Sequence, residues 1–168
     1  MSRRTPLLAL TLALGACASN DGFFWNPLEG PKYDAETGLT FEPEPEQTFV
    51  VAATYLPVSR QGKGLFRERM GGIQAELDAG PEGLIAYSTG GKLVGREYRT
   101  VTIWETEDDM MQFVLGDAHA QAIVDGGDIR DPDKQARVVR WEITPEELPL
   151  EFADVQARTD DDGRQVLY

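Results

Sequence analysis

The sequence predicts one α+β domain, in which a four-stranded antiparallel sheet carries two helices on one face. Three observations lead to this prediction. The 168 residues are 41% hydrophobic and 27% charged, which is the composition of a globular chain with room for one domain. Between residues 48 and 143, apolar runs typical of strands alternate with stretches of helical periodicity. Their order is β-α-β-β-α-β, which is typical of the ferredoxin-like split motif.

The first half of this motif is a strand followed by an amphipathic helix. Residues 49–56 form a mostly apolar run that stops at Pro57, as a buried strand does. After a short connection, apolar residues recur at steps of three to five positions, and the series ends before Gly80-Pro81. This spacing predicts a helix with one apolar face. The residues of that face are Leu65, Phe66, Met70, Ile73 and Leu77.

The second half begins with a hairpin. Residues 84–89 and 97–104 are rich in β-forming side chains, and Gly90-Gly91 between them predicts the turn. Because side chains alternate between the two faces of a strand, Arg99, Val101 and Ile103 share one face. The other face then carries Tyr98, Thr100, Thr102 and Trp104.

A second helix and a last strand complete the motif. Thr106 is placed as an N-cap, and the acids after it favour the positive end of a helix. The four acids within residues 105–109 would also suit a metal ion, but capping is the simpler interpretation. The helix is expected to end at residues 125–127, before a strand over 136–143. Its inward stripe is expected at Met111, Val114, Leu115, Ala118 and Ala122, with His119 on the border.

The first 16 residues are typical of a secretory signal. Two arginines precede an apolar run, residues 7–14, that is too short to span a bilayer, and small residues follow it. The run ends in Leu14-Gly15-Ala16-Cys17, which resembles the lipobox of bacterial lipoproteins. The resemblance implies that residues 1–16 are removed and that Cys17 carries the lipid. An ordinary signal peptide or a buried amphipathic helix is the alternative.

The lipid anchor predicts a place for the protein in the bacterial envelope. More than one acyl chain on Cys17 attaches a protein stably to a membrane. Ala18 follows the cysteine, where an aspartate would favour the inner membrane in the resembled class. We therefore expect the outer membrane, with the domain facing the periplasm.

Two acidic segments flank the predicted domain. Residues 17–47 hold four prolines and no apolar periodicity, which predicts an extended tether. The aromatic cluster Phe23-Phe24-Trp25 within it is expected at the membrane interface or packed on the domain. Residues 144–168 are interpreted as a capping box at Thr144, a short helix through Val155 and a mobile acidic end.

The charge balance and the single Cys and His exclude several functions. A formal charge of −13 argues against binding to nucleic acid, whose phosphates would be repelled. One Cys forbids an internal disulfide, and one Cys with one His cannot complete a zinc site. Four aspartates within 125–133 do not follow the spacing of a calcium loop. We therefore predict no metal site.

The strand Thr100–Glu105 ends in Trp-Glu, the aromatic Phe113 follows nine positions after that Trp, and the pair Ala118-His119 comes after it. With these features, residues 48–143 resemble the antibiotic biosynthesis monooxygenase family of dimeric α+β barrel proteins. The resemblance implies a homodimer in which two sheets pair face to face and enclose a pocket. Members bind polycyclic aromatics, quinones or haem, and some oxidise their ligand without metal or flavin.

Haem degradation is not carried over from this resemblance. Haem-degrading relatives use an Asn on the first strand, a Trp on the second helix and a His after it. The corresponding places in this chain hold Ala53 or Thr54, Phe113 and Ile123. No cofactor is therefore required, although haem binding stays open.

His119 is the candidate catalytic residue, because it is the only side chain that titrates near neutral pH. Its alternative is a structural role in the helix. The residues Tyr98, Thr100, Thr102 and Trp104 are the candidate pocket, with apolar walls and a few polar groups. The same alternation suits an ordinary core or a dimer interface.

Three functions follow as hypotheses. The first is a lipid-anchored periplasmic protein that acts on, or binds, an aromatic or quinone-like molecule, as a cofactor-independent monooxygenase if it is an enzyme. The second is a non-catalytic lipoprotein that binds haem or another small molecule. The third is an envelope protein whose acidic flanks contact a partner.

Overall fold

The computed structural model describes residues 22–161 and 164–165. The predicted signal segment and Cys17 lie outside this range. Among the described residues, no helix is both long enough and apolar enough to cross a bilayer.

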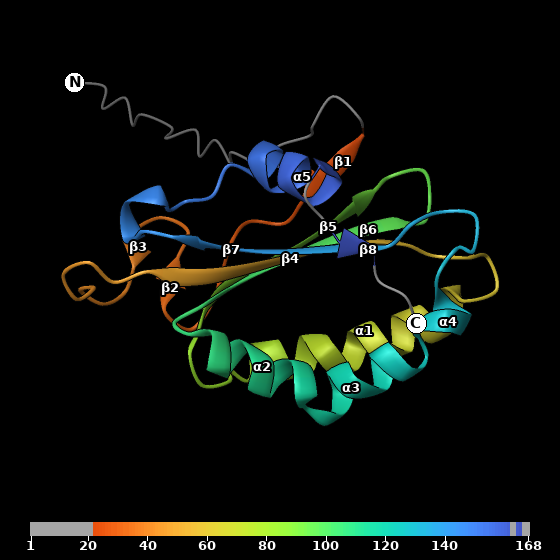
Figure 1. The fold of residues 1–168 in the computed structure, drawn as a ribbon, viewed down its shortest axis with the longest axis horizontal. Helices are drawn as coiled ribbons and strands as arrows, with labels where there is room; N and C mark the ends of the chain where they lie inside the picture. Colours follow the sequence, from red (N-terminus) through yellow and green to blue (C-terminus); the bar gives the residue numbers. More distant parts are fainter. Residues whose placement is uncertain (1–21, 162–163, 166–168) are drawn as a thin grey trace, which may run out of the picture.

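The centre of the molecule is the predicted four-stranded antiparallel sheet. Its strands lie in the order β5-β6-β4-β7, which is the ferredoxin-like arrangement, and this confirms the predicted fold class. Helix α1 connects the first two strands in sequence, and three further helices connect the last two (Figure 1). The elements are β4 (Phe49–Pro57), α1 (Lys63–Asp78), β5 (Leu84–Lys92), β6 (Glu97–Trp104), α2 (Glu107–Leu115), α3 (Asp117–Val124), α4 (Gly126–Ile129) and β7 (Arg137–Ile143).

The predicted second helix is three helices. Thr106 caps α2 as expected, and its hydroxyl accepts a hydrogen bond of 3.1 Å from the backbone nitrogen of Asp109. The prediction of a single helix up to residue 125 is wrong, because the backbone is extended at Gly116 (φ −63°, ψ 157°) and interrupts the helix there. The change of direction there leaves Leu115 72% exposed, although it was expected in the inward stripe.

The hairpin turn also differs from its predicted place. Gly90 and Gly91 lie inside β5, and the turn follows at residues 93–96. At Gly90, a Cβ atom would lie 2.6 Å from the carbonyl oxygen of Phe24 and 2.9 Å from the ring of Trp25. The glycine therefore serves the close approach of another segment and not the turn.

That segment is the predicted tether. Strand β1 (Phe23–Trp25) pairs with the edge of β5, and β2 (Tyr33–Asp34) and β3 (Gly38–Leu39) form a separate hairpin. Trp25, Leu28 and Tyr33 belong to the main apolar core. The described residues therefore differ from an extended tether, because their scattered apolar side chains are buried on the sheet. Of the two expectations for the aromatic cluster, packing on the domain is the one observed, because Phe23 and Trp25 are buried.

The C-terminal segment covers the same face. The capping box at Thr144 is present and opens the 3-10 helix η1 (Pro145–Glu147). Helix α5 (Phe152–Asp161) follows and packs on the sheet, and β8 (Arg164–Gln165) pairs with β7. The mobile acidic end expected from Thr159 is therefore helical as far as Asp161. Thr159 is buried, and its hydroxyl donates to the carbonyl of Val155 at 2.6 Å.

The molecule thus has three layers. Helices α1 to α4 cover one face of the sheet, and α5 with residues 22–47 covers the other (Figure 1). The resemblance placed a second subunit on that other face, which is occupied here by the same chain. The homodimer stays a prediction. The face of the sheet on which the second subunit was expected is covered by α5 and residues 22–47 of the same chain.

Candidate functional site

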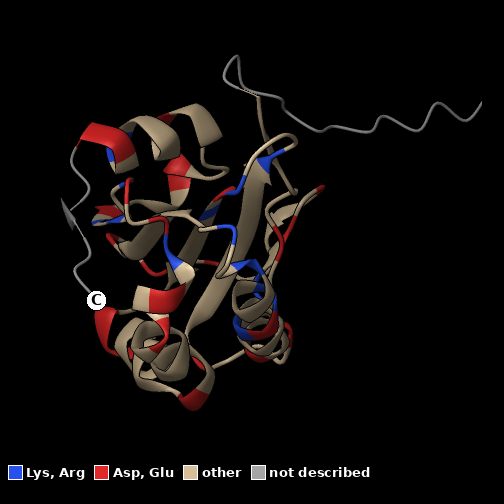
Figure 2. Ribbon diagram, turned by 90° about the vertical axis from the view of Figure 1, so that its right-hand side faces the viewer, with Lys and Arg blue, Asp and Glu red and all other residues tan. Residues whose placement is uncertain are grey.

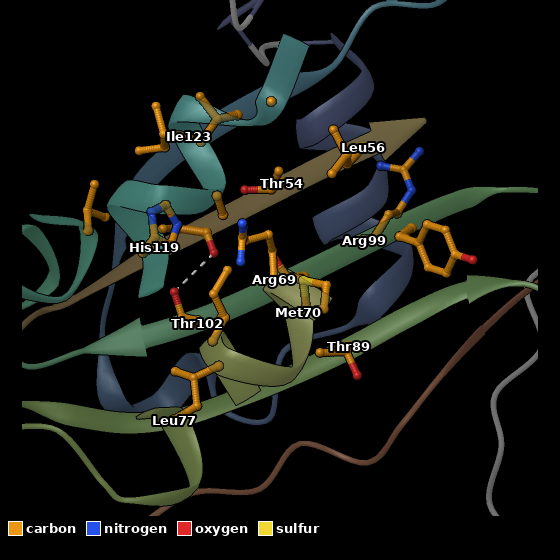
Figure 3. A pocket seen from close by; sticks show the side chains of 18 of the residues that line it. Thr54, Leu56, Arg69, Met70, Leu77, Thr89, Arg99, Thr102, His119 and Ile123 are labelled. Carbon is orange, nitrogen blue, oxygen red and sulfur yellow. Dashed lines mark hydrogen bonds between the residues drawn. The ribbon is translucent and has the colours of Figure 1, made fainter. Parts of the chain in front are cut away.

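A cavity of about 410 Å³ lies between the sheet and the layer of α1 to α4 (Figure 3). It was expected between the sheets of two subunits and lies instead within one chain, on the helix-covered face. Its volume falls in the range of small-molecule sites. The cavity is therefore enclosed by this chain, and its sheet wall does not require a second subunit.

The wall on the sheet side is a row of threonines. Thr89, Thr100 and Thr54 are register partners across β5, β6 and β4, and all three line the cavity. The hydroxyl of Thr89 accepts a hydrogen bond from the amide of Asn26 at 2.9 Å. The hydroxyls of Thr54 and Thr100 have no hydrogen-bond partner among the described residues. Two polar groups on this wall are therefore available to a ligand.

Thr102 completes the polar part of this wall. Its hydroxyl accepts a hydrogen bond of 2.8 Å from the indole nitrogen of Trp104 and makes a weak contact of 3.5 Å with the carbonyl of Ala52. Trp104 is fully buried and lies behind the cavity, where its ring packs 5.1 Å from that of Phe113. It therefore holds Thr102 and Phe113 in place and does not line the cavity itself.

The wall on the helix side is apolar. Because α1, α2 and α3 each turn one face to the sheet, their inward side chains meet above the threonines. Apart from His119, the members of this wall on α1 to α3 that carry no charge are Phe66, Met70, Ile73, Leu77, Met110, Phe113, Val114, Ala122 and Ile123.

His119 is the one polar side chain without charge that the helices bring to the cavity. It lies on α3 and lines the cavity (Figure 3). Its ring meets that of Phe113 edge-on, with centroids 5.5 Å apart. Burial lowers its pKa from the ordinary 6.5, and this outweighs the carboxylate of Glu76 and a hydrogen bond with the backbone of Val114, which both raise it. His119 is therefore neutral at pH 7.

The ring of His119 has one nitrogen without a partner. Nδ1 is buried and has no hydrogen-bond partner among the described residues. A neutral imidazole carries its proton on one ring nitrogen and leaves the other as an acceptor. A neutral imidazole with a free acceptor nitrogen is able to take a proton.

The lowered pKa of His119 predicts a loss of stability in weak acid. The unfolded chain binds a proton at the ordinary pKa of 6.5 and the folded chain only at lower pH. The contribution is therefore complete above pH 6.5 and is lost as the pH falls toward the folded value, by at most about 1.4 kcal/mol per pH unit. Urea unfolding between pH 7.5 and 5 measures this slope. In His119→Gln the slope should become smaller, and an unchanged slope would contradict the prediction.

The charged residues at the cavity are arginines. Arg69 on α1 pairs with Asp125 at 2.5 Å and with Glu68 at 2.8 Å, and Arg140 on β7 pairs with Glu107 at 3.3 Å. Within the described part of the chain, no Asp or Glu lines the cavity. The site is therefore suited to a neutral or anionic ligand and not to a cation.

Several of the acidic groups considered for metal binding have other partners. Glu105 pairs with Lys32 at 2.6 Å, and Asp109 accepts a hydrogen bond of 2.6 Å from the hydroxyl of Thr106. Asp125 is held by Arg69. Among residues 22–161, no group of three or more potential metal-binding side chains comes together.

The sequence-predicted residues thus divide into two sets. Tyr98, Thr100, Thr102 and His119 line one cavity, whereas Trp104 supports it from behind. Thr54 was missed, although the alternation used for residues 98–104 also applies to the strand that carries it. The row of threonines appears only when the register of β4 against β6 is known.

No family model matches the sequence. No curated protein matches it either. Solved structures superpose on the fold at low identity. A conserved protein from Methanosarcina mazei is 14% identical with a TM-score of 0.49, and the match covers 56% of this chain and 92% of that one.

Several of the similar structures carry monooxygenase names. A "putative monooxygenase" from Lactobacillus acidophilus is 15% identical with a TM-score of 0.47, covering 60% of this chain and 49% of that one. A "putative antibiotic biosynthesis monooxygenase" from Deinococcus radiodurans is 14% identical with a TM-score of 0.44, covering 57% and 92%. This likeness concerns the fold, which the strand order of the chain defines by itself.

Proposed function

We propose that this protein is a lipid-anchored envelope protein that binds a small aromatic or quinone-like molecule between its sheet and its helices. The observation that carries the proposal is a pair of threonine hydroxyls, those of Thr54 and Thr100, without partners among the described residues in a mostly apolar cavity that His119 also lines. Buried polar groups normally have partners. A ligand with one or two oxygen atoms on an apolar ring would supply them.

The two walls favour a ligand that is polar at one face only. Threonine hydroxyls donate to a carbonyl oxygen or accept from a hydroxyl group, and the helix side offers aliphatic and aromatic contacts. Quinones, hydroquinones and phenols combine these properties. The absence of carboxylates from the described cavity lining also fits an electron-rich or anionic ring.

His119 gives the proposal its enzymatic form. A neutral imidazole beside a phenol or hydroquinone accepts the hydroxyl proton, and the resulting anion is easier to oxidise. This proton transfer would begin a cofactor-independent monooxygenase reaction, in which oxygen is the second substrate. His119→Gln should lose turnover while keeping the fold, and unchanged turnover would remove His119 from the reaction.

The anchor part of the proposal comes from the sequence. Cys17 in Leu14-Gly15-Ala16-Cys17 would carry the lipid, and Ala18 favours the outer membrane. Replacing Cys17 by serine should move the protein from the membrane to the soluble fraction. A Cys17→Ser chain that stays with membranes would contradict lipid anchoring.

Thr100→Val tests the cavity with little change of shape. Because the Thr100 hydroxyl has no partner, the variant should unfold at the same urea concentration as the parent protein. Loss of one hydrogen bond to the ligand should weaken binding of 1,4-naphthoquinone by about five- to tenfold. Quenching of tryptophan fluorescence measures this affinity, since Trp104 lies directly behind the cavity.

Two matched variants complete the test. Ala122→Phe would fill the cavity from α3 and should abolish binding. Thr48→Val changes an exposed threonine outside the cavity and should leave affinity unchanged. Equal affinity in all three variants would contradict the proposed site.

Haem is the second candidate, because the imidazole of His119 lines the cavity. Titration of the protein with haemin distinguishes it from a quinone site. A Soret band that His119→Gln shifts or removes would favour haem binding. A spectrum that does not change on titration would exclude axial ligation by His119.

A further inference from the structure

The turn between β5 and β6 exposes two large apolar side chains at its tip. Leu93 is 80% exposed and Val94 is 92% exposed. Single exposed apolar residues are common on protein surfaces, but two adjacent ones at the end of a projecting hairpin form a compact apolar point. Lys92 and Arg96 flank them.

The start of the described chain lies beside this tip. Strand β1 pairs antiparallel with the end of β5, so that Phe23 is the register partner of Lys92 (Figure 1). Cys17 stands six positions before Phe23. Six residues span at most about 20 Å when fully extended. A lipid on Cys17 would therefore hold the tip close to the membrane surface.

The charges near the tip suit lipid headgroups. In Figure 2, which faces this end of the molecule, Lys and Arg segments lie on the hairpin and on the strand and helix ends below it. Lys92 and Lys134 both pair with Glu97. Desolvation raises the pKa of Glu97, but its hydrogen bonds with the two lysines outweigh this effect and lower the pKa to about 2. The trio therefore keeps a net positive charge in a chain of formal charge −13.

Acidic groups also lie at this end, at the base of the hairpin. Asp131 and Asp133 belong to the loop that carries Lys134, and the backbone nitrogen of Asp131 donates to the carbonyl of Pro57, the register partner of Glu97. The hairpin belongs to the sheet and carries Lys92 and Arg96 next to its apolar residues. Cations that flank an apolar point are typical of protein parts that rest at a membrane interface.

We propose that the tip of the β5–β6 hairpin, Leu93 and Val94, inserts into the interface of the membrane to which Cys17 is attached. The proposal rests on the lipid anchor of the proposed function. It adds that the domain has one fixed face toward the lipid and does not move freely on a tether. The short link from Cys17 to β1 and the apolar tip together set this orientation.

A fluorescent label at the tip tests the proposal. In the mature acylated protein, the thiol of Cys17 is blocked, so that Val94→Cys supplies the thiol for an environment-sensitive dye such as NBD. The side chain of Val94 is exposed, and its replacement should not disturb folding. In vesicles of phosphatidylethanolamine and phosphatidylglycerol, we expect the emission to shift to the blue and to be quenched by nitroxide-labelled lipids.

Leu115→Cys is the matched control. Leu115 is a similarly exposed apolar residue but lies in the layer of helices, and its label should stay in water. Acylated, vesicle-bound protein whose Val94 label also stays in water would overturn the docking alone. A shift that depends on protein concentration and not on lipid would overturn it in favour of self-association.

Mass spectrometry of the mature chain separates the docking from the anchor. A chain without acyl groups would overturn both, whereas an acylated chain leaves the label experiment to decide. Binding of naphthoquinone is measured independently of either result. Failure of the docking is therefore distinguishable from failure of the proposed ligand site.

Discussion

Replacing Trp25 by alanine is expected to lower the free energy of unfolding by about 3–5 kcal/mol, the usual cost of removing a large buried aromatic side chain. Trp25 is 3% exposed and stacks on Phe152 of α5, with ring centroids 4.8 Å apart and planes 3° from parallel. Its indole nitrogen is buried without a hydrogen-bond partner among the described residues. The loss therefore comes from apolar contact between the N-terminal segment, the sheet and α5.

Phe24→Ala is the control for this prediction. Phe24 is the next residue back in β1, but it is only half-buried and belongs to no described core cluster. Its replacement should cost clearly less than that of Trp25. Urea unfolding followed by circular dichroism compares the two variants. A loss for Trp25→Ala no larger than that for Phe24→Ala would contradict the stabilisation assigned to the contacts of Trp25.

This segment marks the limit of what the sequence predicts about the fold. The strands and helices of residues 48–143 follow from their periodicity, because each has a regular apolar face. The segment before them has none, and its prolines and acids indicate a solvated chain. Burial of Trp25, Leu28 and Tyr33 depends on contacts with strands that are distant in the sequence. The need for glycine at position 90 has the same origin.

The residues of the candidate site were also predicted only in part from the sequence. Alternation in residues 98–104 places Tyr98, Thr100 and Thr102 on one face of a strand, but it does not say whether helices or another segment cover that face. Trp104 lies on the same face at the end of β6. Its ring packs against Phe113 there and does not line the cavity. His119 was found because it is the only histidine, and its placement required the break at Gly116.

Asp160→Asn is expected to lower the free energy of unfolding by about 1.5–3 kcal/mol, because it removes the anion from a charged hydrogen bond to a buried arginine. Arg99 is almost fully buried between the sheet and α5, and one of its nitrogens lies 2.8 and 3.0 Å from the two carboxylate oxygens of Asp160. Asp160 itself is 41% exposed. Its partial hydration keeps the expected loss below that of a fully buried pair.

Asp161→Asn is the matched control, since Asp161 is the exposed neighbouring acid on the same helix. It should leave stability almost unchanged. The urea midpoint of each variant gives the comparison, and equal midpoints for the two would mean that Arg99 does not depend on Asp160.

A second substitution shows where the cost of Asp160→Asn arises. The guanidinium of Arg99 lies 4.6 Å from the ring centre of Tyr55 and 5.0 Å from that of Phe23, so that its surroundings are aromatic. Two of its nitrogens have no hydrogen-bond partner among the described residues. With Asp160 removed, an apolar side chain should suit this place better than an unpaired charge. Arg99→Met should therefore recover stability in the Asp160→Asn protein and lose it in the parent, and a loss of equal size in both would show that the pair does not interact.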